Sequence, residues 1–142
     1  MCIPVSKEPS HIINFIEKHN IHVLPTTPSY LNLLLVSRNI KTSKLNSLKV
    51  ISYGTEPMTE GTLKKLKQVL PNTKLIQTFG TTETGILSIN SKSSTSVELK
   101  LDQASYEYKV IDDLLYIRSK NQALGTLEKG RNRDSWIATG DR

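Results

Sequence analysis

The segment QTFGTTETG, at residues 77–85, combines residue types suited to binding a phosphorylated nucleotide. An aromatic ring can stack on a nucleobase, and glycine lets a ligand approach the backbone closely. Threonine hydroxyls can bond phosphate oxygens, and a carboxylate can hold Mg²⁺ together with those phosphates. The simpler alternative is a Gly/Thr-rich turn between two strands. A short motif by itself leaves both interpretations open.

Two further segments, SYGTEPMT at 52–59 and WIATGDR at 136–142, lie on either side of the first. Each residue has a simpler interpretation when it is taken alone. Glu83 can be a solvated turn carboxylate, Phe79 a core residue at a strand end, and Asp141 a helix cap or a loop acid. Three such segments in order are much harder to obtain by chance, which favours a common site.

Apolar periodicity predicts the elements that position these segments. Thr27 and Thr59 can each cap a helix, the first with Pro28 at its first position. The predicted helices begin at Pro9, Pro28 and Thr59 and end near His19, by Asn39 and at Pro71, and the predicted strands span residues 21–24, 48–53 and 74–79. This alternation indicates an α/β layer with a parallel sheet, whose strand ends meet at one ligand-binding edge.

Beyond Gly85 the apolar residues recur with period two, which predicts strands at 86–89, 97–101, 106–111 and 114–118 without helices between them. We expect a small antiparallel, β-barrel-like segment, followed by a loop over residues 120–134. The sequence therefore predicts an α/β subdomain at residues 1–90 and a β-rich subdomain at residues 91–142.

Composition bears on three classes of protein: nucleic-acid-binding, disulfide-rich and membrane-spanning. The chain has 142 residues and a net charge of +6, from nineteen Lys and Arg against thirteen Asp and Glu. This balance suits polyanionic partners, nucleotides or a solvated surface, and only the charge favours a basic nucleic-acid-binding domain. The single cysteine, Cys2, excludes an internal disulfide framework, and no apolar run is long enough to span a bilayer. We expect a cytoplasmic protein without a membrane span.

In their order and types, the three segments resemble those of the adenylate-forming, or AMP-binding, superfamily of acyl- and aryl-CoA ligases, peptide-synthetase adenylation domains and luciferases. The resemblance covers nearly the whole chain: IHVLPTTPSYLNLLL is similar to the family's strand and Pro-started helix, and LLYIRSKNQALGTLE to its barrel segment. It implies that both subdomains are incomplete portions of a larger domain. It also implies an AMP-forming acid-thiol ligase that uses ATP and Mg²⁺ to activate a carboxylic acid, with coenzyme A as acceptor and a carrier protein as the alternative.

The resemblance also implies a role for individual residues. The backbone of Gly54, Thr55 and Glu56 would pass along the adenine, Gln77 would lie near its amino group, Phe79 would stack on the purine, and Asp141 would bind the ribose hydroxyls. Thr82 and Glu83 would be catalytic, the first bonding the α-phosphate and the second coordinating Mg²⁺. The acyl pocket would be bordered by Tyr53, Thr78, Gly80 and Gly85.

Two parts of the family pattern have no match here: the Ser/Thr/Gly-rich phosphate loop with its lysine, and the small C-terminal domain with the catalytic lysine. Within the matched region, Asp113-Leu114-Leu115 replaces the usual Gly-Glu-Leu. We therefore expect a fragment that is inactive alone and self-associates through sheet surface exposed near residues 21–24 or 50–53. The alternative is a catalytically silent remnant that binds a nucleotide or a protein.

Overall fold

A computed structural model of the chain describes residues 3–37, 42–87, 89–91, 97–101, 106–119, 122–123, 125–126, 130–131 and 135–141. The chain divides into two compact units. The first comprises Met1–Gln77 and Ser91–Glu98, and the second comprises Thr78–Asn90 and Leu99–Arg142. The domain boundary expected at residue 90 stays a prediction.

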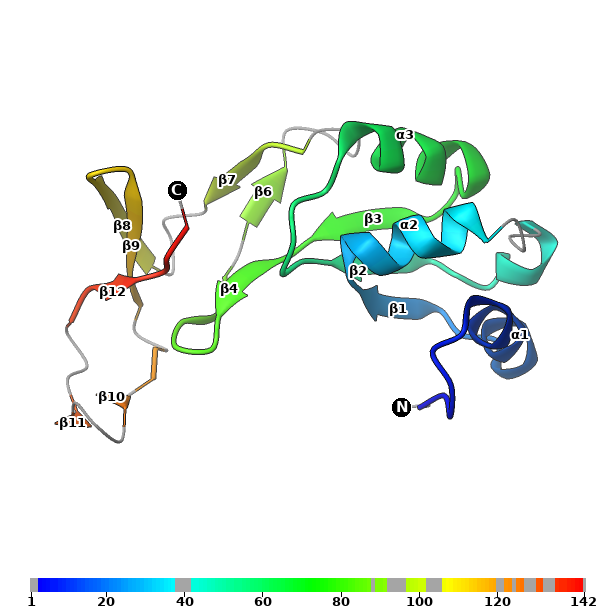
Figure 1. Cartoon of the computed structure of the whole chain (residues 1–142), viewed down its shortest axis with the longest axis horizontal. Coiled ribbons are helices and arrows are strands. Elements are labelled where there is room, and N and C mark those ends of the chain that lie inside the picture. The colour runs from blue at the N-terminus through cyan, green and yellow to red at the C-terminus, as the bar shows by residue number, and fades with distance from the viewer. Residues whose placement is uncertain are drawn as a thin grey trace. The chain divides into compact units, whose positions relative to one another are not determined.

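The first unit alternates helices with strands, as the sequence predicts (Figure 1). Its elements are α1 Pro9–His19, β1 Val23–Thr26, α2 Pro28–Val36, a 3₁₀ helix at Thr42–Leu45, β2 Val50–Tyr53, α3 Glu60–Val69 and β3 Lys74–Gln77. The predicted caps are confirmed, because the Thr27 hydroxyl accepts from the Tyr30 amide and the Thr59 hydroxyl from the Thr62 amide. Asn20 ends α1 in the left-handed conformation, which asparagine tolerates.

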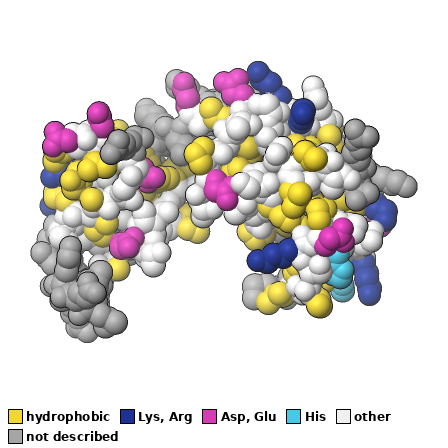
Figure 2. Space-filling model, in the orientation of Figure 1, with side chains coloured by type: hydrophobic (Ala, Val, Ile, Leu, Met, Phe, Trp, Pro, Cys, Tyr) yellow, Lys and Arg dark blue, Asp and Glu magenta, His cyan; other side chains and the backbone are white. Residues whose placement is uncertain are grey.

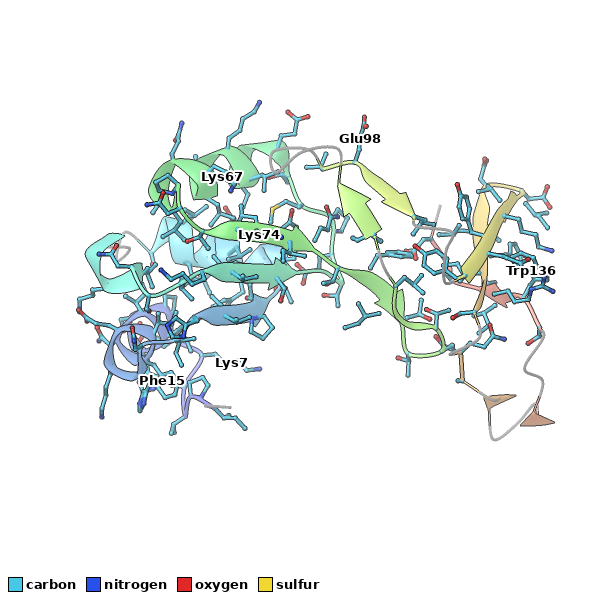
Figure 3. The ribbon with its side chains drawn as sticks, turned by 180° about the vertical axis from the view of Figure 1, so that it is seen from behind. Lys7, Phe15, Lys67, Lys74, Glu98 and Trp136 are labelled. Carbon is cyan, nitrogen blue, oxygen red and sulfur yellow. The ribbon has the colours of Figure 1, made fainter. Side chains whose placement is uncertain are left out.

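The three strands form a parallel sheet in the order β1-β2-β3. Right-handed crossovers between successive neighbours place α2 and α3 on the same face of this sheet. Figures 1 and 3, seen from opposite sides, show α2 lying against that face. The parallel sheet confirms the predicted α/β layer and gathers the carboxyl ends of its strands at one edge.

One face of the sheet is buried and the other is open. Ile51 and Leu75 point into a core that includes Leu31 of α2 and Leu63 of α3. Residues of the opposite face stay accessible, with Val23 54% and Ile76 36% exposed. Figure 3, seen from the side opposite to α2, shows the strands of this face with Lys74 of β3 on it, and Figure 2 shows the molecule from the side of α2. Parallel sheets are normally covered on both faces, so this apolar surface is unusual for the fold.

The second unit is built from short strands. They are β4 Phe79–Thr81, β5 Gly85–Leu87, β6 Ile89–Ser91, β7 Leu99–Leu101, β8 Tyr106–Ile111, β9 Leu114–Ser119, β10 Gly125–Thr126, β11 Gly130–Arg131 and β12 Ile137–Ala138. Leu87, Tyr106 and Ile117 form its small core. The predicted antiparallel character is confirmed for β8–β9, and β4–β5, β10–β11 and β12–β9 also pair antiparallel. These described strands pair as open sheets of two or three strands and do not close a barrel.

The outer face of the β12-β9-β8 sheet carries a basic and aromatic cluster. The Lys109 ammonium lies 4.2 Å from the ring centre of Trp136, and the Arg118 guanidinium lies 5.0 Å from it. Figure 3 shows Trp136 against these strands. Arg118 also pairs with Glu107 across the strands, at 2.6 Å. Cation–π and cross-strand contacts of this kind stabilise a small sheet that has little core of its own.

Several predicted boundaries differ from the structure. The first strand, predicted at 21–24, is found at Val23–Thr26, and the second, predicted at 48–53, begins at Val50. The sequence predicts that Phe79 ends the third strand, but that strand stops at Gln77 and Phe79 begins the β4–β5 hairpin. The expected loop at 120–134 contains the short pair β10–β11, and its residues 120, 121, 124, 127–129 and 132–134 lie outside the described part of the chain. Among the described residues, no helix combines the length and apolar character that a bilayer crossing requires.

Candidate functional site

Within the first unit, predicted site residues meet at the carboxyl edge of the sheet. Tyr53 and Gln77 end their strands as register partners across β2 and β3. Tyr53 is buried, with 3% of its surface exposed, and burial raises the pKa of its phenol. The structure therefore places the acyl-pocket candidate Tyr53 beside the adenine candidate Gln77.

The side chain of Gln77 has a buried polar atom without a hydrogen-bond partner in the described part of the chain, which is unusual in a protein interior. Its Oε1 atom is buried and has no hydrogen-bond partner among the described residues. An unpaired buried acceptor is costly, so it calls for an explanation such as a donor supplied by a ligand. An acceptor of this kind fits an exocyclic amino group such as that of adenine.

The loop after β2 holds Gly54, Thr55 and Glu56. Gly54 is buried, and Thr55 has a φ of +69°, which is uncommon for a residue with a side chain. The Thr55 hydroxyl donates to the Gly54 carbonyl at 2.6 Å. The Glu56 carboxylate accepts from the Ser29 amide at 3.0 Å. Hydrogen bonding with the Ser29 side chain, and to a smaller extent with this amide, lowers the pKa of Glu56. The backbone of the loop is thus fixed at the sheet edge, and its passage along adenine stays a prediction.

In the second unit, the segment 79–85 is a hairpin, so the alternative of a turn between two strands is correct as a description of shape. Thr81 pairs with Gly85, and Thr82 and Glu83 lie exposed at the tip between them. The Glu83 carbonyl accepts from the Ala123 amide at 2.6 Å. The Thr81 hydroxyl next to Glu83 lowers the pKa of that carboxyl. The tip therefore presents a hydroxyl and a carboxylate that is ionised at neutral pH.

Gly80 and Gly85 have distinct structural reasons to be glycine. A Cβ on Gly80 would overlap the carbonyl oxygen of Gly85, so no side chain fits between β4 and β5. Gly85 has a φ of +68°, the left-handed conformation that glycine adopts without strain. Both glycines are therefore required by the hairpin, whatever they border.

Phe79 and Thr78 lie where the chain enters the hairpin. The Phe79 side chain is half-buried and packs against the small core around Leu87. Phe79 therefore belongs to the margin of this core, as the simpler interpretation predicted. Its stacking on a purine stays a prediction. Thr78 is also half-buried and joins Gln77 directly to the hairpin.

Asp141 is held in place by the backbone of β9. The Leu115 amide donates to the Asp141 carbonyl at 3.0 Å, and the Asp141 amide donates to the Thr139 hydroxyl at 3.1 Å. That hydroxyl in turn donates to the Leu115 carbonyl, and Gly140 turns the chain with a φ of +83°. The Asp141 side chain is exposed, so its carboxylate is available to a polar ligand such as a diol.

Sequence reasoning missed the residues that hold these loops. Ser29 receives Glu56, and Thr84 is buried inside the hairpin with 3% of its surface exposed. The pair of threonines three residues apart, at 81 and 84, was a signal for a side-chain-stabilised turn. Nothing near Glu56 in the sequence could have indicated a partner 27 positions away.

Glu83 could coordinate Mg²⁺ only together with other ligands such as substrate phosphates. Mg²⁺ typically binds one or two carboxylates and completes its octahedron with waters and substrate phosphates. The exposed, ionised Glu83 provides one such carboxylate at the tip. In the part of the chain that the structure describes, no three His, Cys, Asp or Glu side chains gather as a metal site.

A hollow of about 460 Å³ is found elsewhere in the first unit, along β1. It is lined mainly by apolar side chains of α1, of β1 and of the segment between them, including Phe15, Val23 and Ile21 in that order, with Lys7 at its border (Figure 3). None of the predicted site residues lines it. Residues from both faces of β1, such as Val23 and Leu24, line the hollow, so it runs along this edge strand.

Comparison with known proteins identifies the family. The family described as AMP-binding enzyme matches residues 1–125. Acyl-CoA synthetase 7 of Caenorhabditis elegans is 38% identical over 68 residues, which are 48% of this chain and 13% of that protein. The 4-coumarate–CoA ligase-like 6 of Arabidopsis thaliana is 28% identical over 93% of this chain and 27% of its own length. The chain thus spans about a quarter or less of these relatives.

Solved structures agree at the level of the fold. An anthranilate CoA ligase in complex with anthranoyl-AMP superposes with a TM-score of 0.75 and 22% identity, over 94% of this chain and 29% of that one. A luciferase-like enzyme from Zophobas morio gives a TM-score of 0.69 with 19% identity, over 96% and 37%. Because the family match covers most of the sequence, the chain belongs to the AMP-binding enzyme family of adenylate-forming ligases.

Proposed function

We propose that this chain is part of an ATP-dependent ligase that activates a carboxylic acid as its acyl-adenylate. The observation that carries the proposal is the buried Oε1 of Gln77, which has no hydrogen-bond partner in the described part of the chain. Gln77 ends β3 directly before a hairpin with Thr82 and Glu83 at its tip. Adenylate formation joins two anions, a carboxylate and ATP, so positioning and charge neutralisation must supply most of the catalysis.

Each residue then has a task. Gln77 accepts a hydrogen bond from the adenine amino group, with the Gly54–Glu56 backbone along the base and Phe79 against its face. Asp141 accepts from the ribose hydroxyls. The Thr82 hydroxyl donates to an α-phosphate oxygen. Glu83 would hold Mg²⁺, which supplies charge neutralisation for the phosphates when it is bound.

The acid would lie near Tyr53, Thr78, Gly80 and Gly85. Coenzyme A is the acceptor that we propose, since the relatives include a CoA synthetase and CoA ligases. These relatives are several times longer than this chain, so we also propose that the 142 residues alone do not complete the reaction. Acid-dependent pyrophosphate exchange with ATP, Mg²⁺ and a panel of fatty, aryl and amino acids should stay at background. Clear exchange would refute that part.

The adenine assignment is tested by comparing AMP with IMP, which carries a carbonyl where AMP carries the amino group. Binding is followed by NMR titration of the purified chain. AMP should bind more tightly than IMP by roughly tenfold, the value of one well-made hydrogen bond to a buried group. Gln77→Met preserves the side-chain length and removes the acceptor, so the preference should disappear. Equal binding of AMP and IMP by the unaltered chain would contradict the assignment, as would a preference that survives Gln77→Met.

A further inference from the structure

A residue distant in sequence accepts a hydrogen bond from the backbone at the N-terminus of α2. Pro28 has no amide hydrogen, Tyr30 donates to the Thr27 hydroxyl, and Leu31 donates to the Thr27 carbonyl in the first helical bond. The amide of Ser29 is the donor left over, and it is taken by the Glu56 carboxylate at 3.0 Å. The first turn of α2 has no acidic residue of its own. Glu56 thus supplies the negative charge that a helix N-terminus favours.

Glu56 also follows directly after a strained residue. Thr55 has a φ of +69°, a conformation that L-residues hold only where their surroundings enforce it. On one side of Thr55, the buried Gly54 continues from β2. On the other side, the Glu56 side chain is anchored to α2. The loop is therefore fixed at both ends around the residue that carries the strain.

We propose that Glu56 is a positioning residue: its carboxylate clamps the loop after β2 onto the N-terminus of α2 and so holds the Gly54–Thr55 backbone in its nucleotide-binding conformation. This inference rests on the proposed function, in which that backbone lies along the adenine. It assigns the side chain of Glu56 to α2 and leaves only the backbone for the ligand. The clamp joins the loop after β2 to the helix that follows β1, the neighbouring strand of the sheet.

Three variants separate the clamp from a general effect of charge. Glu56→Ala removes the acceptor. Glu56→Gln retains an oxygen at the same distance and loses the charge. Glu60→Ala is the matched control, because Glu60 is an exposed glutamate in the first turn of α3 that pairs with Lys64, four residues along the same helix.

The readouts are amide exchange of Ser29, the backbone coupling constant of Thr55, and AMP affinity, all measured by NMR on the 142-residue chain. In Glu56→Ala, Ser29 should exchange roughly tenfold faster, Thr55 should lose the coupling of its positive φ, and AMP affinity should fall roughly tenfold. In Glu56→Gln, the Ser29 exchange rate, the Thr55 coupling and the AMP affinity should lie close to those of the unaltered chain. Glu60→Ala should resemble the unaltered chain.

The inference is overturned if Glu56→Ala leaves Ser29 and Thr55 as they are in Glu60→Ala. It is also overturned if both signals change while AMP binds as before, because the clamp would then be structural only. Failure of the unaltered chain to bind AMP would reject the proposed function and, with it, the nucleotide part of this inference. The Ser29 and Thr55 signals would still decide whether the clamp exists.

Discussion

Thr81 and Thr84 exchange hydrogen bonds across the base of the β4–β5 loop. The Thr81 amide donates to the Thr84 hydroxyl at 3.1 Å, and the Thr84 amide donates to the Thr81 hydroxyl at 3.2 Å. The two hydroxyl oxygens are 3.2 Å apart. This pair closes the loop that carries Thr82 and Glu83. The conformation of the exposed tip therefore depends on the hydrogen bonds of the buried Thr84.

Replacing Thr84 with valine should loosen this loop without leaving a cavity, because valine has nearly the same shape. The Thr81 amide would lose its acceptor, at a cost of about 1–3 kcal/mol in the free energy of unfolding. Hydrogen exchange at Thr81 and chemical denaturation measure the effect. Thr82→Val, on the exposed tip, should change neither quantity by more than about 0.5 kcal/mol. Equal effects of the two variants would show that the pair does not hold the loop.

Gly80→Ala should disrupt the hairpin, because the new methyl group would overlap the Gly85 carbonyl oxygen. Overpacking against backbone costs about 1–3 kcal/mol of stability. Gly61→Ala is the matched control: the space around it is open, and it lies in α3, where alanine favours the helix by up to about 1 kcal/mol. Denaturation curves should therefore shift in opposite directions, and a shift in the same direction would contradict the close approach of β4 and β5 at Gly80.

Glu83→Gln should weaken the use of Mg²⁺ in a catalytically competent protein that contains these residues. The proposed ion stabilises charge at the α-phosphate, so kcat and kcat/KM should fall together, and half-maximal rate should require more Mg²⁺. Steady-state kinetics against Mg²⁺ concentration provide the measurement. An unchanged kcat and Mg²⁺ requirement would leave Glu83 as a turn residue only.

The pH dependence of the Glu83 role follows from its lowered pKa. The ionised form is favoured in the folded state, so its contribution is fully present above the ordinary value of 4.5 and is lost as the pH falls through the lower folded value. A ¹³C NMR titration of the Glu83 carboxyl should show a midpoint below 4.5. Thr81→Val, which removes the neighbouring hydroxyl, should move that midpoint upward.

Asp141→Ala should act on binding more than on chemistry. The ribose hydroxyls that it would contact keep their charge during the reaction, so the lost interaction is shared by ground and transition states. In a competent protein, the KM for ATP should rise about tenfold while kcat changes little. Asp141→Asn retains one acceptor oxygen, so its KM for ATP should lie between those of the unaltered protein and Asp141→Ala. A fall in kcat with an unchanged KM would refute the ribose role.

The isolated chain should self-associate through the open sheet face. Val23 and Ile76 lie on that face, whereas Pro25 in β1 has no amide hydrogen and discourages pairing of another strand along the edge. Ile76→Lys should shift light-scattering masses toward the monomer. Val36→Lys, at an exposed position near the end of α2, should not. A sharp monomer peak from the unaltered chain at high concentration would refute this prediction.

Local features of this protein could be predicted from short stretches of its sequence. Thr27 with Pro28, and Thr59, were enough to place the starts of α2 and α3, because capping depends on residues within one turn. Alternating helices and strands determined the parallel sheet. The ordered motifs also sufficed for the family, which the match over residues 1–125 confirms.

Tertiary structure decided which side chains hold the candidate site in place. Glu56 reaches Ser29, and Leu115 fixes Asp141, through hydrogen bonds between residues 26 to 27 positions apart, which no local pattern encodes. The break between Gln77 and Phe79 was equally hidden, because an apolar run does not reveal where a strand leaves one sheet and enters another. Burial of the Gln77 oxygen likewise depends on packing around β3, and it exists only once the sheet has formed.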